Sequence, residues 1–320
     1  MKNNAKKNNH EVHGHVHGVV NAEIASTDQG IWAIKWSFIG LFLTAFLQII
    51  VVIYSGSVAL LADTIHNIGD AATAVPLLIA FKLLRKKPTK RFTYGYGRVE
   101  DLAGVFIVLI ILISAIIAGY ESINRLMHPV AMTNLWAVIG ASVIGCLGNE
   151  AVAVLRIRTG KKMNSAALIA DGYHARVDGL TSLAVLLGAI GTWLGYPLAD
   201  PIIGLIITVT IMKIVYDSGK VIFIRLIDGV DPEIIDEIRH AVSHAPQVKG
   251  VSEVRARWLG HMLVAELNIT VDSRLSVEKG HEVAATVRHE LRHHMNYLEN
   301  AIVHVDPEIA SGEQYHDSHS

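Results

Sequence analysis

A nine-residue pattern that occurs twice carries the side chains best suited to metal chemistry. One copy covers residues 62–70 and the other covers residues 170–178, and both read Ala-Asp-x-x-His-x-x-x-Asp. On a helix, steps of three and four residues keep the histidine and the two acids on one face. Both copies lie in long apolar stretches, where an ionisable side chain is costly and indicates a functional site.

The expected metal ligands are the histidine and the second acid of each copy: His66, Asp70, His174 and Asp178. Each pair has i, i+4 spacing, which suits chelation by one helix. Two imidazoles and two carboxylates form a tetrahedral set of borderline hardness that suits Zn²⁺. Neither copy contains cysteine or methionine, which argues against Cu(I), and Ca²⁺ and Mg²⁺ prefer all-oxygen sites. Fe²⁺, Co²⁺ and Mn²⁺ remain alternative metals for this site.

The first acid of each copy, Asp63 or Asp171, is expected outside the ligand set. There it would hold the tautomer of an imidazole or serve as a gate charge. The alternative for the whole pattern is a network of interhelical hydrogen bonds, but that role in membranes usually falls to Ser, Thr or Asn. The repetition of one spacing in two apolar stretches favours the metal site.

The composition places these motifs in a membrane protein. The 320 residues are 51% hydrophobic and 18% charged, and their mean hydropathy of +0.39 is high for a soluble protein. The formal net charge of −1 gives no basic signal for nucleic acid. The single cysteine, Cys146, excludes an intrachain disulfide and a cysteine-rich metal site. No apolar run directly follows the polar N-terminus, so no cleavable signal peptide is expected.

Six apolar stretches are long enough to cross a bilayer as helices. They cover residues 31–54, 58–84, 102–120, 135–155, 163–193 and 199–216. The loops after the second, fourth and sixth stretches are rich in Lys and Arg, whereas the turns at 55–57, 128–134 and 195–200 have none. By the positive-inside rule, both termini lie on the cytoplasmic side. We therefore predict a multi-pass protein of the inner (cytoplasmic) membrane.

The chain divides into four parts, of which the six-helix transmembrane domain covers residues 31–227. Residues 1–30 form a His-rich tail, disordered by composition, that either captures metal loosely or is merely solvated. Residues 228–308 read in the order αββαβ, which predicts a small cytoplasmic α+β domain. Residues 309–320 are expected to be a second disordered tail. The predicted fold class is an α-helical membrane protein with this small α+β domain attached.

These features together resemble the cation diffusion facilitator family, which includes bacterial transporters of zinc and other divalent metals. The resemblance rests on the six spans, on His-x-x-x-Asp in the second and fifth, and on the stretches at 55–63 and 94–100. It implies a homodimer that exports a divalent transition metal from the cytoplasm against an inward flow of protons. Position by position, it implies a transport site made of His66, Asp70, His174 and Asp178. The two-histidine form of this site is associated with zinc.

The resemblance also implies a regulatory and dimerising role for the cytoplasmic domain, with metal bound at the subunit interface. The residues that match the metal-binding positions of relatives are His281, His304 and Asp306, and the last two share one face of a strand. A histidine that relatives carry near the end of the second strand is Asn268 here, with His261 as a substitute. The alternative is that each histidine is simply solvated. We interpret the other helix histidines as solvated: His240, His244, His289, His293 and His294.

Two further sets of residues match family positions. Arg98 and Asp228 correspond to residues that form a charged interlock near the dimer contact of relatives, although two unrelated solvated charges would look the same in sequence. Some bacterial members bind another metal in the loop between the second and third spans. The matching residues here are Thr89, Phe92 and Tyr96, which cannot supply such a site, so we expect no metal in that loop.

The predicted function is secondary transport, namely Zn²⁺ export by proton antiport, and the protein is not expected to be an enzyme. Zn²⁺ is also the expected regulatory ligand. The expected partners are a second copy of the chain, the lipid bilayer and protons, and no nucleic acid. The alternatives are an exporter of Fe²⁺, Mn²⁺, Co²⁺ or Cd²⁺ with the same site, a membrane metal sensor, or a membrane metalloenzyme. The metalloenzyme is disfavoured because four ligands at one point leave no open coordination position.

Overall fold

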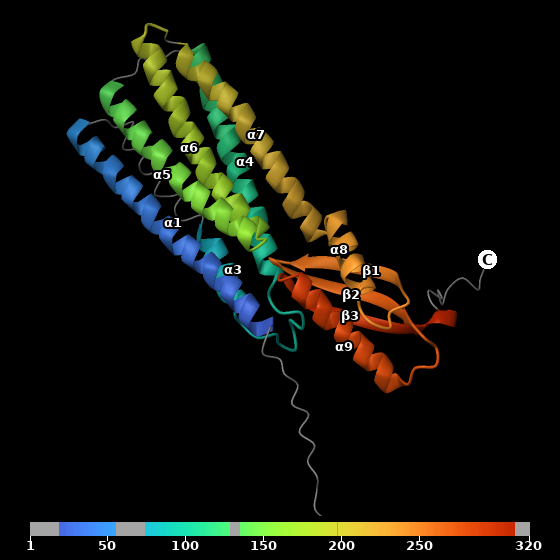
Figure 1. Cartoon of the computed structure of the whole chain (residues 1–320). Coiled ribbons are helices and arrows are strands. Elements are labelled where there is room, and N and C mark those ends of the chain that lie inside the picture. Colours follow the sequence, from blue (N-terminus) through green and yellow to red (C-terminus); the bar gives the residue numbers. More distant parts are fainter. Residues whose placement is uncertain (1–18, 56–73, 129–134, 197, 311–320) are drawn as a thin grey trace, which may run out of the picture.

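The computed structural model describes residues 19–55, 74–128, 135–196 and 198–310. These residues form an elongated bundle of helices with a small α/β domain at one end (Figure 1). Among them, five helices are long and apolar enough to cross a membrane. They are α1 (Val19–Ser55), α4 (Arg98–Met127), α5 (Leu135–Lys162), α6 (Ala166–Trp193) and α7 (Ala199–Leu226). A shorter apolar helix, α3, covers Ala74–Leu84.

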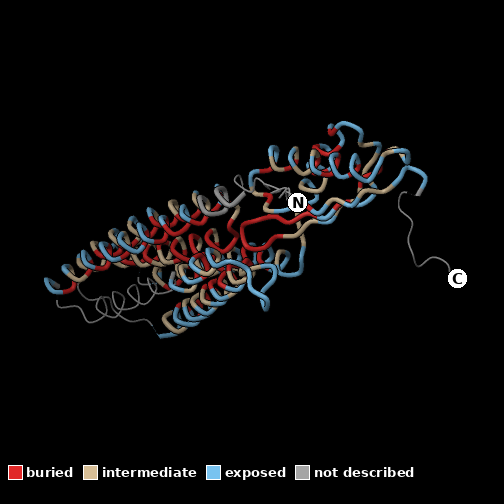
Figure 2. The backbone as a smooth tube through the Cα atoms, turned by 90° about the horizontal axis from the view of Figure 1, so that it is seen from below, coloured by how far each residue is buried: buried red, intermediate tan, exposed pale blue. Residues whose placement is uncertain are grey.

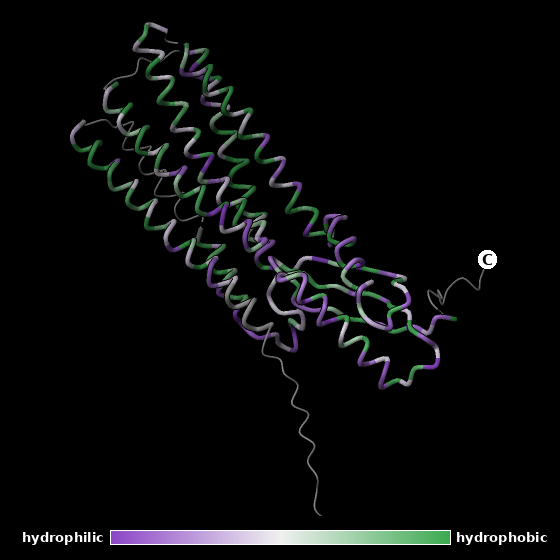
Figure 3. Tube along the Cα trace, viewed as in Figure 1, coloured by the Kyte–Doolittle hydropathy of each residue, from purple (hydrophilic) through white to green (hydrophobic). Residues whose placement is uncertain are grey.

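The outer surface of the bundle is apolar. Large side chains such as Phe42, Ile53 and Val209 are 66%, 73% and 72% exposed. Figure 3 shows hydrophobic residues along the length of the long helices, and Figure 2 shows buried residues on their inward sides. A soluble monomer rarely exposes contiguous apolar surface of this extent, so this surface faces lipid. The predicted class of α-helical membrane protein is therefore confirmed.

The helices extend beyond the apolar stretches that predicted them. α4 begins at Arg98 and not at residue 102, and α5 continues to Lys162 and not to residue 155. Lys, Arg and Glu are good helix formers, so a helix continues where its hydropathy falls. Arg156, which the sequence placed in the basic loop after the fourth span, therefore lies inside α5. α3 is the last part of the second predicted span, whose first part lies outside the described residues, so six remains the predicted count.

The C-terminal domain confirms the predicted αββαβ order. Its elements are α8 (Pro232–Ser243), β1 (Gly250–Leu259), β2 (Met262–Val271), α9 (Val277–His294) and β3 (Leu298–Pro307), followed by a 3₁₀ turn at Glu308–Ala310. The sheet order is β1-β2-β3, with β1 antiparallel to β2 and β2 parallel to β3. Gly260 forms the β1–β2 turn with a φ of +64°, a conformation that favours glycine. The parallel pair needs a crossover connection, and α9 provides it.

A separate hydrophobic core holds the C-terminal domain together. Ile238 and Val242 of α8 and Val287 and Leu291 of α9 are fully buried, as is Leu267 on the central strand. The i, i+4 spacing within each helix gives one apolar stripe that faces this core. The opposite faces of α8 and α9 are left for polar residues.

Candidate functional site

Helix α6 carries the second copy of the repeated pattern. The helix begins after Ser165, whose hydroxyl accepts a hydrogen bond from the Leu168 amide at 3.1 Å, as an N-cap residue does. His174 Nδ1 and Asp178 Oδ1 lie 3.9 Å apart, one turn from each other. Both side chains are largely buried, with His174 only 1% exposed. One helix thus presents an imidazole and a carboxylate on the same inward face.

The first copy of the pattern, with Asp63, His66 and Asp70, lies outside the described residues. α3 directly follows it in sequence and contacts α1, α4 and α6. The convergence of His66 and Asp70 on His174 and Asp178 therefore stays a prediction. Within the described ranges alone, no group of three or more His, Cys, Asp or Glu side chains is arranged to hold a metal.

Asp171, the first acid of the second copy, forms a buried ion pair across to α5. Arg156 Nη1 lies 3.1 Å from Asp171 Oδ2, and the two side chains are 1% and 0% exposed. The same Nη1 donates a hydrogen bond to the Asp171 carbonyl oxygen at 3.4 Å. Within the second copy of the repeated pattern, Asp171 thus has Arg156 as its counter-charge. Its expected role toward an imidazole or as a gate charge stays a prediction.

Two glycines allow α5 and α6 to approach closely enough for this ion pair. A Cβ at Gly172 would lie 2.6 Å from Ile157 Cγ1 and 2.9 Å from its backbone nitrogen. A Cβ at Gly160 would lie 2.9 Å from the backbone of α6. Small residues at helix interfaces are the usual means of close packing in membranes. Gly172 lies inside the repeated pattern, so the pattern also serves packing.

A second buried polar group joins the bundle to the C-terminal domain. His261 Nδ1 lies 2.7 Å from Glu100 Oε2, and both residues are only 1% exposed. The His261 Nε2 lies 2.9 Å from the Ser26 hydroxyl of α1. The Ser165 hydroxyl at the start of α6 donates to the other oxygen of Glu100. The turn between β1 and β2 is therefore tied to α1, α4 and α6 at one point.

This position separates His261 from the other predicted ligands of the C-terminal domain. His261 lies in the β1–β2 turn, directly before β2 begins at Met262, whereas His304 on β3 pairs with Asn268 further along β2. From Leu263 to Asn268 the strand advances about 17 Å, at about 3.3 Å per residue. The structure therefore does not bring His261 together with His304. Both ring nitrogens of His261 are already engaged, Nδ1 with Glu100 and Nε2 with Ser26.

His304 and Asp306 lie on one face of β3, as their spacing indicates. His304 Nε2 lies 2.8 Å from Asp306 Oδ1, and His304 is mostly exposed. His281 lies in the first part of α9, which contacts β3. The three residues thus belong to neighbouring elements, with a direct contact between His304 and Asp306. Their shared metal site stays a prediction.

Arg98 and Asp228 form an ion pair at the junction of the two domains. Arg98 Nη1 also donates to the carbonyl oxygen of Arg225 at 2.8 Å. Asp228 has a φ of +66°, where the chain leaves α7. Arg257 of β1 approaches its second oxygen at 3.8 Å. The pair links the start of α4 to the end of α7, and its relation to a dimer contact stays a prediction.

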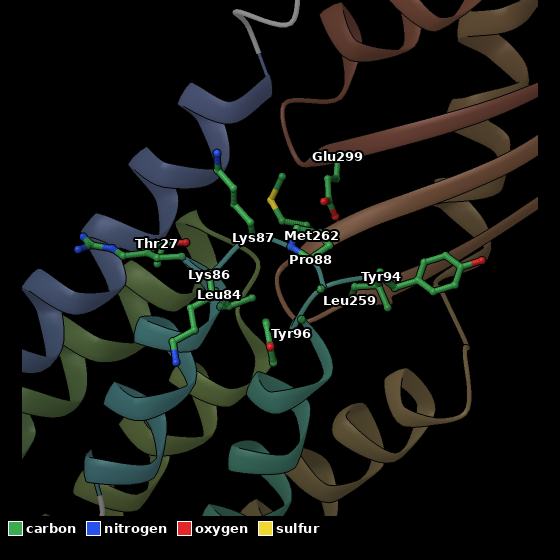
Figure 4. A pocket seen from close by; sticks show the side chains of 13 residues that line it. Thr27, Leu84, Lys86, Lys87, Pro88, Tyr94, Tyr96, Leu259, Met262 and Glu299 are labelled. Carbon is green, nitrogen blue, oxygen red and sulfur yellow. The ribbon is translucent and has the colours of Figure 1, made fainter. Parts of the chain in front are cut away.

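A cavity of about 300 Å³ lies between α1, the segment that follows α3 and the β1–β2 turn. Its lining includes three consecutive cations, Arg85, Lys86 and Lys87, and one acid, Glu299. Figure 4 shows that the Lys86 and Lys87 side chains point in different directions. The cavity therefore offers space but no converging set of ligands.

Sequence reasoning did not single out Arg156 and Glu100. Each is a charged residue at the edge of an apolar stretch, which in sequence resembles the end of a span. No local pattern in the sequence marked either residue, because α5 continues past Arg156 and α4 begins at Arg98, before Glu100, only in the folded structure.

Comparison with known proteins identifies the family. Residues 34–224 match the model of the cation efflux transmembrane domain, and residues 230–308 match the model of the cytoplasmic domain of cation efflux proteins. A Mycobacterium tuberculosis protein named "Probable cation efflux system protein" is 51% identical over 288 residues, which cover 90% of this chain and 87% of the relative.

More distant relatives have different names. The manganese efflux system protein MneP of Bacillus subtilis is 28% identical over 259 residues, covering 78% of this chain and 87% of MneP. The magnetosome protein MamB of Magnetospira sp. is 27% identical over 283 residues, covering 88% of this chain and 95% of MamB. A solved structure of the MamM CTD is 29% identical and covers 24% of this chain and 95% of that chain, with a TM-score of 0.24.

The chain belongs to the cation diffusion facilitator family of metal efflux transporters. It is therefore a multi-pass membrane transporter and not an enzyme. The resemblance noted in the sequence is confirmed.

Proposed function

We propose that this chain exports Zn²⁺ from the cytoplasm in exchange for protons and holds the ion at His66, Asp70, His174 and Asp178. The observation that carries the proposal is the pair on α6, where His174 Nδ1 and Asp178 Oδ1 lie 3.9 Å apart on a buried face. Ionisable groups at such a position in a membrane bundle indicate an ion pathway. The same spacing in the first copy supplies the other half of the ligand set.

Proton exchange follows from the chemistry of the ligands. Metal binds the neutral imidazole and the ionised carboxylate, so metal and protons compete for the same atoms. The ordinary pKa of histidine lies near physiological pH, so a moderate pH difference across the membrane shifts this competition. A more acidic outer side releases the metal there, and the protons return with the empty carrier.

The donor set favours zinc among the divalent metals. Imidazole suits zinc, whereas manganese prefers a site dominated by carboxylate, carbonyl and water. The relative named a manganese efflux system protein keeps Mn²⁺ as the alternative cargo, together with Fe²⁺, Co²⁺ and Cd²⁺. Two imidazoles and two carboxylates match the tetrahedral preference of Zn²⁺.

Flux through reconstituted protein tests both the cargo and the activity. Proteoliposomes are given the same concentration of each divalent metal, and uptake is followed with an enclosed metal-sensitive dye. We expect Zn²⁺ to be transported fastest. A higher rate for Mn²⁺ would overturn the zinc assignment, and no flux of any metal would favour a membrane sensor.

His66→Asp is expected to weaken the selectivity for zinc. The change replaces a nitrogen ligand by an oxygen ligand and makes the site harder and more anionic, which favours Mn²⁺ relative to Zn²⁺. The same flux assay should show a higher Mn²⁺ to Zn²⁺ rate ratio than the wild type. His289→Asp makes the same substitution on α9 and should leave the ratio unchanged. Equal ratios in His66→Asp and the wild type would mean that His66 does not set selectivity.

We further propose that the chain acts as a homodimer in the inner membrane, with both termini and the C-terminal domain in the cytoplasm. Metal bridging His281, His304 and Asp306 between two copies would stabilise one arrangement of the subunits and so bias the helices above. The contact between His304 and Asp306 supports this proposal, because it places two of the donors 2.8 Å apart on β3. The buried attachment of His261 to Glu100 supports it too, since it links the domain to α4.

Replacing His281 and His304 together by alanine is expected to shift the zinc dependence of export without abolishing it. The transport site is in the membrane helices, so flux at saturating zinc should stay measurable. The measurement is initial zinc flux against cytoplasmic-side zinc concentration. The double variant His289→Ala with His293→Ala removes two other α9 histidines and should follow the wild-type curve. An unchanged curve for the first double variant, or total loss of flux in a folded dimer, would contradict the regulatory role.

A further inference from the structure

Two exposed histidines lie close together at the C-terminal end of α8: His240 in its last turn and His244, the C-cap residue that directly follows it. His240 Nε2 and His244 Nε2 are 3.3 Å apart. The two rings are perpendicular, with centroids 4.6 Å apart. The residues have i, i+4 spacing, which places them on one face one turn apart. Neither residue belongs to the transport pattern or to the His304–Asp306 contact on β3.

The distance between the nitrogens matches the edge of a tetrahedral metal site. Zinc binds imidazole nitrogen at about 2.0–2.1 Å, so two tetrahedral ligands are separated by about 3.3–3.4 Å. Adjacent ligands of an octahedral ion at the same bond length would be only about 2.8–3.0 Å apart. A pair of histidines with i, i+4 spacing on a helix is also a known zinc-binding arrangement.

The rest of α8 holds the two histidines in place. Ile238, Ala241 and Val242 are buried in the core of the C-terminal domain, so the opposite face of the helix is fixed toward solvent. Pro232 lies in the first turn, a position that favours the helix start. Backbone order around the pair therefore does not have to be created when a metal binds.

Without metal, the 3.3 Å contact is that of one imidazole N–H donating to the other ring nitrogen. When a metal binds, the donating ring carries this proton on its Nδ1 instead, so that both Nε2 atoms present lone pairs to the metal. Two coordination positions remain for water, since within the described part of the chain no third His, Cys, Asp or Glu completes a group at this point.

We propose that His240 and His244 form a two-histidine chelate for a late divalent transition metal, with Zn²⁺ as the fitting ion, at the C-terminal end of α8. The site is separate from the transport site and does not depend on the proposed direction or cargo of transport. It gives the C-terminal domain a metal-binding position besides the one expected at His281, His304 and Asp306.

The test is site-resolved histidine modification of the full chain in detergent. Diethyl pyrocarbonate modifies accessible, neutral imidazoles, and mass spectrometry reports the rate at each histidine with and without Zn²⁺. With zinc at ten times the dissociation constant of the site, modification of His240 and His244 should slow by about tenfold. His293 and His294 on α9 are adjacent residues with ring centroids 6.0 Å apart, so their rates serve as the internal control and should change little.

The His244→Gln variant separates a chelate from two independent surface histidines. If both rings hold one metal, His240 should lose its zinc protection when His244 is replaced, at the same zinc concentration. The matched control His294→Gln removes one exposed histidine of α9 and should leave the protection of His240 intact. Zinc protection of His240 that persists in His244→Gln, or no protection of either residue in the wild type, would overturn the proposal.

Discussion

Replacing Asp178 by alanine is expected to reduce zinc flux through reconstituted protein to that of protein-free vesicles. Asp178 is expected to supply one of four ligands and half of the negative charge that offsets Zn²⁺ inside an apolar bundle. Its removal leaves part of the metal charge uncompensated in a medium of low dielectric constant, where that is costly. Asp178 is 12% exposed, so its removal leaves only a small space at the edge of the buried face, and α6 itself should persist. The measurement is dye-detected zinc uptake, with protein incorporation matched between samples.

Two further variants make this result specific. His174→Ala removes the other expected ligand of α6, one turn away, and should lose flux in the same way. Asp217→Ala makes the same chemical change as Asp178→Ala at an exposed position on α7, and it should transport like the wild type. Size-exclusion chromatography checks that each variant is folded. Wild-type flux in Asp178→Ala would exclude the α6 pair from the transport site.

Breaking the ion pair between Arg156 and Asp171 is expected to give the largest loss of stability. Both side chains are essentially inaccessible, at 1% and 0% exposure. Removing one partner of such a pair leaves a buried, uncompensated charge, which costs about 3–5 kcal/mol. Arg156→Met should therefore lower the unfolding temperature of the protein in detergent, and Asp171→Asn should do so by leaving Arg156 without its counter-charge. Thermal unfolding followed by circular dichroism measures both.

A double variant separates loss of the pair from loss of packing. Arg156→Met combined with Asp171→Asn removes both charges, so it should be more stable than the sum of the single effects predicts. Glu150 and Arg176 form an ion pair between the same two helices, but both side chains are partly exposed. Glu150→Gln should therefore destabilise the protein less than either buried change. Equal, small losses for all three single variants would show that the Arg156–Asp171 pair does not stabilise the bundle.

Local patterns were sufficient to predict most of the architecture. Apolar stretches of about 20 residues identify spanning helices because the thickness of the bilayer sets their length. The αββαβ order was readable because α8 and α9 repeat apolar residues at i, i+4, as Ile238 and Val242 do, and because β2 alternates apolar and polar residues, as in Leu267 and Asn268. The repeated pattern likewise predicted that His174 and Asp178 share a face, since that depends only on helical geometry.

Partners that lie far apart in sequence could not be predicted in this way. Arg156 follows an apolar stretch and precedes other basic residues, which in sequence is typical of a loop at the membrane surface. Its burial depends on the close approach of α6, which Gly172 permits. His261 was grouped with ligands of its own domain, but its partner Glu100 is on α4. No periodic pattern in the sequence links these two positions.

The His240 and His244 pair illustrates a different limit. The i, i+4 spacing was visible in the sequence, but an exposed helix histidine is most often only solvated. The distinguishing observation is the 3.3 Å between the two Nε2 atoms, which needs side-chain positions and not only spacing.

The most direct test of the central claim is zinc movement driven by a proton gradient alone. Wild-type protein is reconstituted into vesicles that hold a zinc-sensitive dye in an acidic interior. The outer medium is more alkaline, the membrane potential is clamped, and the same concentration of Zn²⁺ is added to the outer medium in every sample. If protons leave as zinc enters, uptake should rise with the size of the pH difference and should slow when an ionophore removes that difference, while Asp178→Ala vesicles stay at background. Zinc uptake that is independent of the pH difference would contradict proton exchange, and no uptake in the wild type would contradict zinc transport itself.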